Sequence, residues 1–128
     1  MRAALEGVAF QVADLTDAIS HDLGGKISVL RVDGGAAANN LLMQTQANLS
    51  DITVDRPENI ETTGFGAALF SALGSGIFNN LEDLKSARST QRIFMPSIAA
   101  SERERFRNGW MRAIKAVRTF ANSAPEGL

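Results

Sequence analysis

Apolar residues recur every three or four positions near the start of the chain, which is the spacing of one face of an α-helix. The positions are Leu5, Val8, Ala9, Val12, Leu15, Ala18 and Ile19. The glycine pair after Leu23 predicts the end of this helix, since glycine adopts the left-handed backbone of a helix C-cap. A second apolar face runs from Phe106 to Ala121. Ser101 and Glu104 precede it as an S-x-x-E capping box, which predicts a terminal helix.

Two short runs rich in β-branched residues predict strands, at residues 26–32 and 52–55. The second strand is expected to end before Pro57, because proline restricts the residue before it. Residues 36–49 lie between the strands and are rich in good helix formers. Strand–helix–strand order predicts an α/β fold whose short parallel sheet is joined by a right-handed crossover and packed by helices.

The second half of the chain continues with helical and extended segments. Small residues dominate 62–73, which predicts a helix that lies close to a sheet or a ligand. Asn80 is the expected N-cap of a short helix that ends near Arg88. Residues 92–95 are expected to be extended, and residues 122–128 are expected to form a flexible tail. Two strands make a poor core, so either the helices cover the sheet unusually well or strands that belong beside it lie outside this sequence.

Composition narrows the classes of function. The chain has 128 residues, of which 45% are hydrophobic and 21% charged, as in an ordinary globular domain. The absence of cysteine excludes disulfides, thiolate metal sites and a thiol nucleophile, and the single histidine, His21, excludes a histidine-rich metal site. No apolar run approaches the roughly 20 residues that cross a bilayer. Glu6 is an acid too early for a signal peptide, so a cytoplasmic protein is expected.

Charge is unevenly distributed, although the net charge is only −1. Residues 1–81 carry 4 basic and 9 acidic side chains, whereas residues 82–118 carry 9 basic and 4 acidic ones. The basic segment is either an anion-facing surface or a solvated helix with mixed charges, and the second interpretation is favoured. Its basic side chains point in several directions, which argues against a nucleic-acid partner. Phe106 and Trp110 are more typical of core packing than of a base-stacking platform.

The strongest chemical signal is the segment strand–Asp33-Gly34-Gly35–helix. Glycines at such a turn let the backbone approach a ligand closely, and the following helix N-terminus favours an anion. Asn39 is expected one helical turn further on, beside Gly35, where its amide could both donate to and accept from an adenine edge. By pattern alone a tight turn is the commoner explanation, because the segment is neither G-x-G-x-x-G nor a Walker A loop.

Other candidate groups have structural explanations. Asp33 could act as a base or hold a metal-bound phosphate, but a role in fixing the turn or capping the helix is favoured. His21 lies at a helix end, where the helix dipole explains it better than a catalytic triad does. Glu6, Glu58 and Glu61 are scattered carboxylates without a partner that the sequence identifies.

The stretch from Val32 to Asn40 reads Val-Asp-Gly-Gly-Ala-Ala-Ala-Asn-Asn. It resembles the FGGY carbohydrate kinases. Within that family, it resembles the members that phosphorylate glycerol more than those that phosphorylate sugars. The resemblance continues at residues 42–47, 56–58, 61–68 and 107–110. It implies that residues 1–128 are a single partial domain, the C-terminal part of the second of two actin-like, ribonuclease-H-like domains.

The resemblance also implies an activity, the ATP-dependent phosphorylation of glycerol to glycerol 3-phosphate. Gly35 matches a glycine that contacts the nucleotide, and Asn39 matches an asparagine near adenine. Gly34 shares the tight turn, and the backbone of Ala36 faces the same pocket. These residues are therefore expected to form part of the wall that binds ATP or ADP.

By the same resemblance, the catalytic aspartate is expected upstream of Met1, and the first phosphate loop and the main glycerol contacts belong to another domain. No residue here is expected to be catalytic or to bind a metal. Magnesium would be carried by the nucleotide. Because phosphoryl transfer is mostly positioning and charge stabilisation, the chain alone is expected to be inactive.

A different class of function is a stand-alone interaction module that kept the fold and lost the chemistry. An uncovered sheet edge and an apolar face would then favour association with a second copy, and a homo-oligomer is expected. The family resemblance favours the kinase interpretation over this alternative.

Overall fold

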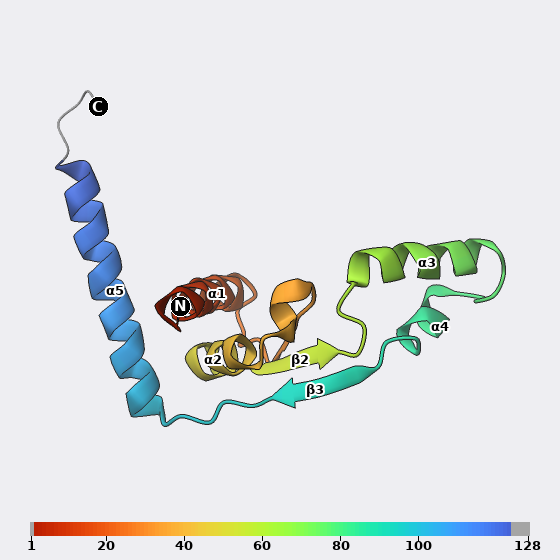
Figure 1. Cartoon of the computed structure of the whole chain (residues 1–128), viewed down its shortest axis with the longest axis horizontal. Helices are drawn as coiled ribbons and strands as arrows, with labels where there is room; N and C mark the ends of the chain where they lie inside the picture. Colours follow the sequence, from red (N-terminus) through yellow and green to blue (C-terminus); the bar gives the residue numbers. More distant parts are fainter. Residues whose placement is uncertain (1, 124–128) are drawn as a thin grey trace. The chain divides into compact units, whose positions relative to one another are not determined.

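The computed structural model describes residues 2–123. The chain divides into two compact units, Met1–Pro96 and Ser97–Leu128. The first unit holds a small sheet and its helices, and the second holds one long helix (Figure 1). One domain can contain both units, so a single domain over residues 1–128 stays a prediction.

The N-terminal helix α1 spans Arg2–Asp22 and confirms the helix predicted from its apolar spacing. It ends in a Schellman motif, in which the Gly25 N–H donates to the Ser20 carbonyl and the Gly24 N–H to the His21 carbonyl, both at 3.1 Å. Gly24 has φ of 65°, which lies in the left-handed region that glycine adopts without strain. The glycine pair therefore ends the helix as predicted.

The sheet has three strands in the order β1-β2-β3: Val29–Arg31, Thr53–Pro57 and Thr90–Phe94. β1 and β2 are parallel, as predicted, with Leu30 opposite Val54. β3 overlaps the segment expected to be extended but begins two residues earlier, at Thr90. It pairs antiparallel to β2, so the sheet is mixed and not parallel throughout.

The prediction that the second strand ends before Pro57 is wrong, because β2 includes this residue. The pairing with β3 shifts register between Arg56 and Pro57. Proline is tolerated at such an irregularity, since a regular ladder bond from its missing N–H is not required there.

One face of the sheet is covered by helices. α2 (Asn40–Ser50) lies next to β2 and β3, and α1 packs against α2 (Figure 1). The core residues between them are Ala9, Ala13, Ala37, Leu42, Met43, Ala47, Leu49, Val54 and Phe94. Since side chains alternate along a strand, the neighbours of Val54 and Phe94 face the opposite side. That side has a cavity of about 430 Å³ lined by Val29, Arg31, Thr53, Asp55 and Ile93.

Two more helices of the first unit follow β2. α3 spans Thr62–Gly74, which confirms a helix at residues 62–73. It packs on α4 and has no buried residue, so the close packing on a sheet that its small residues predicted is not observed. α4 spans Leu81–Lys85, and the side chain of Asn80 accepts hydrogen bonds from the backbone N–H groups of Glu82 and Asp83, at 2.9 and 3.0 Å. Asn80 is therefore the predicted N-cap, although the helix ends before Arg88.

The second unit consists of α5, Ala100–Asn122. The predicted capping box does not form, because Ala99 is the N-cap residue, with no side-chain bond, and Ser101 is already helical. No residue of α5 is buried, so the core role expected of Phe106 and Trp110 is not observed. The helix includes Asn122, the first residue of the expected tail, and residues 124–128 lie outside the described residues. Within residues 2–123, no helix combines the length and apolar character required to cross a membrane.

Candidate functional site

The candidate site is the turn that follows β1. Gly34 adopts φ of 76° and ψ of 173°, a conformation that is essentially restricted to glycine. Its N–H donates to the carbonyl of Ile60 at 2.7 Å, which ties the turn to the loop before α3. A Cβ atom added to the exposed Gly35 would meet no atom within 4 Å, so the space beside this residue is open. The turn therefore presents accessible backbone to a ligand.

The segment predicted as one helix over residues 36–49 is in fact two. A 3-10 helix, η1, spans Gly35–Ala38, and α2 begins at Asn40. Asn39 lies between them as the N-cap of α2, with extended backbone, and not one turn inside a helix as expected. Its Oδ1 accepts hydrogen bonds from the N–H groups of Leu41 and Leu42, at 3.0 and 3.1 Å. Asparagine breaks the helix here because its side chain competes for backbone N–H groups.

This cap changes what Asn39 can offer a ligand. A carbonyl-type oxygen has two lone pairs, and both partners of Oδ1 are now backbone N–H groups. The Nδ2 amide group remains as a donor on an exposed side chain. Asn39 can therefore recognise an acceptor on a ligand, such as a purine ring nitrogen, through donation alone. Gly35 and Ala36 are exposed beside it, just before the positive N-terminal end of α2.

Asp33 has a structural role in this turn. Its Oδ2 accepts a hydrogen bond from the hydroxyl of Thr62, the first residue of α3. This contact fits the favoured interpretation, in which Asp33 fixes the turn. The sequence placed both residues in separate elements and gave no sign that they meet.

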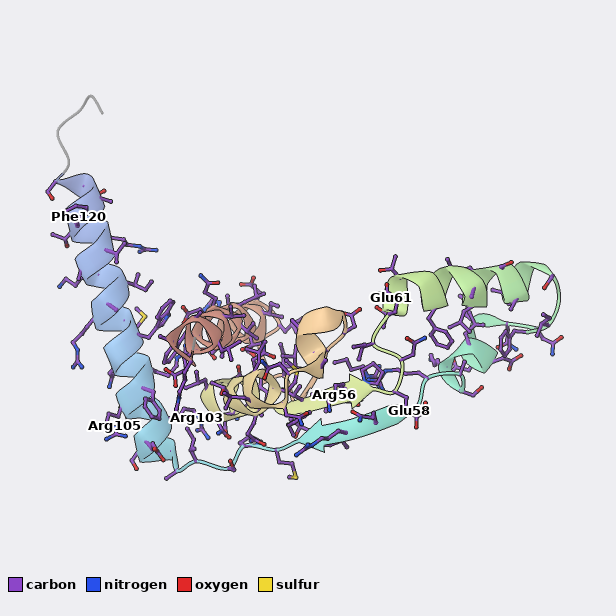
Figure 2. The ribbon with its side chains drawn as sticks, viewed as in Figure 1. Arg56, Glu58, Glu61, Arg103, Arg105 and Phe120 are labelled. Atoms are coloured by element: carbon purple, nitrogen blue, oxygen red, sulfur yellow. The ribbon has the colours of Figure 1, made fainter. Side chains whose placement is uncertain are left out.

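Arg56 is a residue that the sequence analysis missed. It lies on β2 (Figure 2), and it is 6% exposed. Its Nη1 donates to the carbonyl of Ala37 in η1 at 2.7 Å, and its Nε donates to Oε1 of Gln91 on β3 at 2.7 Å. The signal that could have found it is an arginine directly after a run of strand residues, followed by proline.

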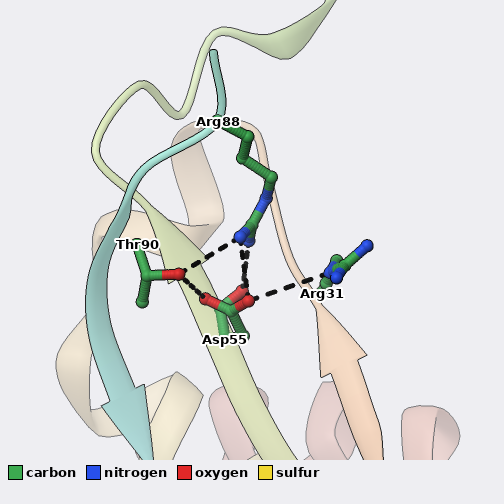
Figure 3. Close-up of polar contacts among 4 residues, drawn as sticks. All are labelled: Arg31, Asp55, Arg88 and Thr90. Carbon is green, nitrogen blue, oxygen red and sulfur yellow. Dashed lines mark hydrogen bonds and ion pairs between the residues drawn. The ribbon is translucent and has the colours of Figure 1, made fainter. Parts of the chain in front are cut away.

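The neighbouring residue, Asp55, forms a polar cluster on the other face of the sheet (Figure 3). Its carboxylate pairs with Nη1 of Arg88 at 2.9 Å and accepts a hydrogen bond from the hydroxyl of Thr90 at 2.9 Å. Arg31 lies 3.8 Å away. Burial alone would raise the pKa of Asp55. The bonds from Arg88 and Thr90 and the charges of both arginines outweigh burial, so the pKa lies below its ordinary value of 3.8.

Of the remaining candidate carboxylates, Glu6 lies on α1, whereas Glu58 and Glu61 lie in the loop between β2 and α3. Glu6 pairs with Arg2 on α1, and Glu58 accepts a hydrogen bond from Ser89 at 2.8 Å. His21 lies in the last turn of α1, where the sequence placed it. Within the described part of the chain, no three His, Cys, Asp or Glu residues could hold a metal ion together.

A cavity of about 260 Å³ lies between the end of η1 and the end of β2, and the predicted residues Gly34, Gly35, Ala36 and Asn39 are not among its lining residues. Its lining residues are Ala38, Asn40, Arg56, Pro57, Glu58, Ile60 and Gln91. The lining combines apolar side chains with amide and charged groups, as is common in small-molecule sites. The turn and this cavity are therefore the candidate binding site of the first unit.

Comparison with known proteins gives a consistent result. Residues 1–75 match the C-terminal domain of the FGGY family of carbohydrate kinases. A glycerol kinase of Pseudomonas fluorescens is 42% identical over 126 residues, and one of Enterococcus casseliflavus is 44% identical over 120 residues. These matches cover 98% and 94% of this chain but only 25% and 24% of the relatives. The chain thus spans about a quarter of their length.

Solved structures show the same fold. The Plasmodium falciparum glycerol kinase crystallised with ADP matches with a TM-score of 0.79 and 30% identity, over 90% of this chain and 23% of that protein. A xylulose kinase from Rhodospirillum rubrum matches with a TM-score of 0.70 and 21% identity, over 91% of this chain and 24% of that protein. The second likeness concerns the fold alone. Together they confirm the prediction of an α/β fold that is part of an actin-like kinase domain.

Proposed function

This chain belongs to the FGGY family of carbohydrate kinases, and we propose on that basis that it is the C-terminal part of an ATP-dependent glycerol kinase. The reaction of the complete enzyme is the transfer of a phosphoryl group from ATP to glycerol, which gives glycerol 3-phosphate. Relatives at 42% and 44% identity that bear the name glycerol kinase support glycerol over a sugar as the substrate.

The role proposed for this chain is one wall of the adenosine site, made by Gly34, Gly35, Ala36 and Asn39. The observation that carries it is the geometry of the turn. Gly34 adopts a conformation essentially restricted to glycine, Gly35 leaves open space, and the exposed Asn39 amide can donate beside them. A ligand with a polyanionic group and a ring acceptor fits these features, and ADP has both.

Catalysis also requires groups that this chain does not contain, and these are expected in the parts of a complete kinase that lie outside the matched quarter. We propose that these parts supply the catalytic aspartate, the phosphate loop and the glycerol contacts, and that magnesium arrives with the nucleotide. The chain alone is then inactive, because phosphoryl transfer depends on positioning and charge stabilisation by all of these groups. Glycerol-dependent ATP consumption by the purified chain, above a heat-denatured control, would contradict this.

We also propose that the kinase is cytoplasmic and forms homo-oligomers. Exposed apolar residues on the uncovered face of the sheet, Val29 and Ile93, support association. The kinase relatives do not favour a stand-alone oligomerisation module. Sedimentation of the chain over a range of concentrations tests association, and a monomer at all of them would contradict it.

Asn39 allows a sharp test of the nucleotide site. Asn39→Ser keeps a side-chain oxygen that caps α2 but removes the Nδ2 donor. Binding of ADP by the isotope-labelled chain, followed through its amide resonances, should weaken about three- to tenfold, as expected for one lost hydrogen bond. The wild-type dissociation constant is expected at roughly 1 mM or weaker, because only part of the site is present.

The matched control is Asn80→Ser. Asn80 caps α4 with the same pair of bonds that Asn39 makes on α2, but it lies outside the glycine turn. This variant should bind ADP like the wild type. Equal weakening by both substitutions would assign the effect to lost capping, and an Asn39→Ser chain that binds ADP normally would remove Asn39 from the site.

A further inference from the structure

Arg56 is a buried cation whose contacts are with neutral groups. It donates to the Ala37 carbonyl and to Gln91, and its guanidinium lies 5.1 Å from the centre of the Phe94 ring. Within residues 2–123 the structure gives it no ion pair. A buried charge without an opposite charge is costly, and an apolar side chain of similar volume would fill the space with less penalty. Packing alone therefore does not explain why a guanidinium group, with its charge and its several N–H donors, occupies this position.

The hydrogen bond from Arg56 to the carbonyl of Ala37 connects the end of the glycine turn to β2. Two contacts hold the start of the turn: Asp33 to Thr62, and Gly34 to Ile60. Arg56 holds its other end, since Ala37 lies in η1. Gly35 and Ala36, the exposed backbone of the candidate site, lie between these points. Their positions are thus set from both sides, and on the side of Ala37 the hydrogen bond from Arg56 adds to the burial of Ala37 in the core.

We propose that Arg56 is a positioning residue of the nucleotide site, which holds the carbonyl of Ala37 and thereby sets the backbone of Gly35 and Ala36 and the cap residue Asn39 for a nucleoside diphosphate or triphosphate. Its positive charge, unpaired by any carboxylate in the described structure, also favours the polyanion. This inference rests on the proposed function and goes further, because it assigns a role to a residue that does not touch the ligand.

The test compares Arg56→Met, which removes the charge and the donors but keeps much of the stem, with Arg92→Met. Arg92 is the matched control because it also stacks on Phe94, at 4.6 Å from the ring centre, but it lies exposed on β3. ADP is titrated into the full isotope-labelled chain under conditions in which each variant is folded. Arg56→Met should bind ADP about tenfold more weakly, and Arg92→Met should bind it normally.

Three further comparisons separate this role from a purely structural one. Without ligand, Arg56→Met should shift the amide resonances of residues 34–39 and speed their hydrogen exchange, while the amides of α1 keep their wild-type values. Adenosine in place of ADP should show a smaller loss, because adenosine lacks the phosphates that respond to the charge. Arg56→Lys keeps the charge but not the planar fork, so it should restore part of the ADP affinity and remain about threefold weaker than wild type.

Each result decides the inference. If the wild-type chain binds ADP at the turn and Arg56→Met binds it equally well, Arg56 has no positioning role and the proposed function stands. If ADP moves no resonance of residues 34–39 in the wild type, the proposed function is overturned and this inference with it. If Arg56→Met does not fold, Arg56→Lys decides: weaker ADP binding with an unchanged Arg92→Met control supports the role, and wild-type affinity overturns it.

Discussion

At the residue scale, the side chains of two consecutive charged residues of β2 lie on opposite faces of the sheet. Side chains alternate along a strand, so Asp55 and Arg56 face opposite ways. Asp55 meets Arg88 and Thr90 on the side away from the core helices. Arg56 reaches Ala37 in η1. Asp55 therefore connects β2 with Arg88 and with Thr90 at the start of β3 on one face. Arg56 connects β2 with the candidate nucleotide turn on the other face.

Asp55→Asn tests the first of these connections. The substitution removes the negative charge from a side chain that is 12% exposed and bonded to Arg88 and Thr90. We expect a loss of about 1–3 kcal/mol in the free energy of unfolding at neutral pH, measured by urea titration, because bonds to a buried charged group are broken. Glu82→Gln is the control. It breaks an exposed pair with Lys85, and such a pair contributes little.

The contacts of Asp55 also predict that the free energy of unfolding depends on pH. The folded pKa of Asp55 lies below its ordinary value of 3.8, so ionised Asp55 stabilises the folded state. This contribution is fully present above pH 3.8 and is lost as the pH falls through the folded pKa. The stability difference between wild type and Asp55→Asn should therefore shrink in acid. A difference that stays constant well below pH 3.8 would show that the carboxylate charge is not its source.

At the element scale, helix ends show which local signals determine structure. The glycine pair after α1 and the Asn80 cap of α4 act as the sequence predicts, because each bond joins groups close along the chain. The Ser101 and Glu104 box fails, because the residue with extended backbone is Ala99, at φ of −64° and ψ of 150°. A capping motif fixes the residue types at a helix start but not the register at which the helix begins.

Gly24→Ala tests the end of α1 directly. Gly24 has φ of 65°, where a Cβ atom is disfavoured, whereas Gly25 has no positive φ. Neither position is crowded, since an added Cβ would meet no atom within 4 Å at either. We expect Gly24→Ala to lower the free energy of unfolding by about 1–2 kcal/mol and Gly25→Ala to change it by less than about 0.5 kcal/mol. Thermal unfolding of both variants measures this, and equal losses would refute the left-handed cap.

The sequence predicts the elements of the candidate site better than its contacts. The strand, the glycine turn and the residues that we propose for the wall are local in sequence, so they could be identified without knowledge of the fold. The ties that hold the turn join residues far apart in the chain, such as Asp33 with Thr62 and Arg56 with Ala37. The predicted strand also ended before Arg56, so its burial in β2 could not be foreseen.

At the scale of the whole molecule, the functional conclusion depends on the family match. Element order predicts an α/β fold, and the structure confirms it with a mixed sheet. A three-stranded sheet with helices of its own unit on one face does not specify a kinase. The motif from Val32 to Asn40 and the match of residues 1–75 to the family supply that step. Because the chain spans about a quarter of its relatives, the role that we propose for it is limited to one wall of a site.

The most direct measurement is a titration of the isotope-labelled, 128-residue chain with ADP and, separately, with glycerol, following every backbone amide. We predict that ADP shifts the resonances of residues 34–39, with smaller changes in the loop near Ile60, and that glycerol shifts none. Shifts by ADP confined to other elements, or no shift at the turn at any ADP concentration, would contradict the assignment of the nucleotide wall.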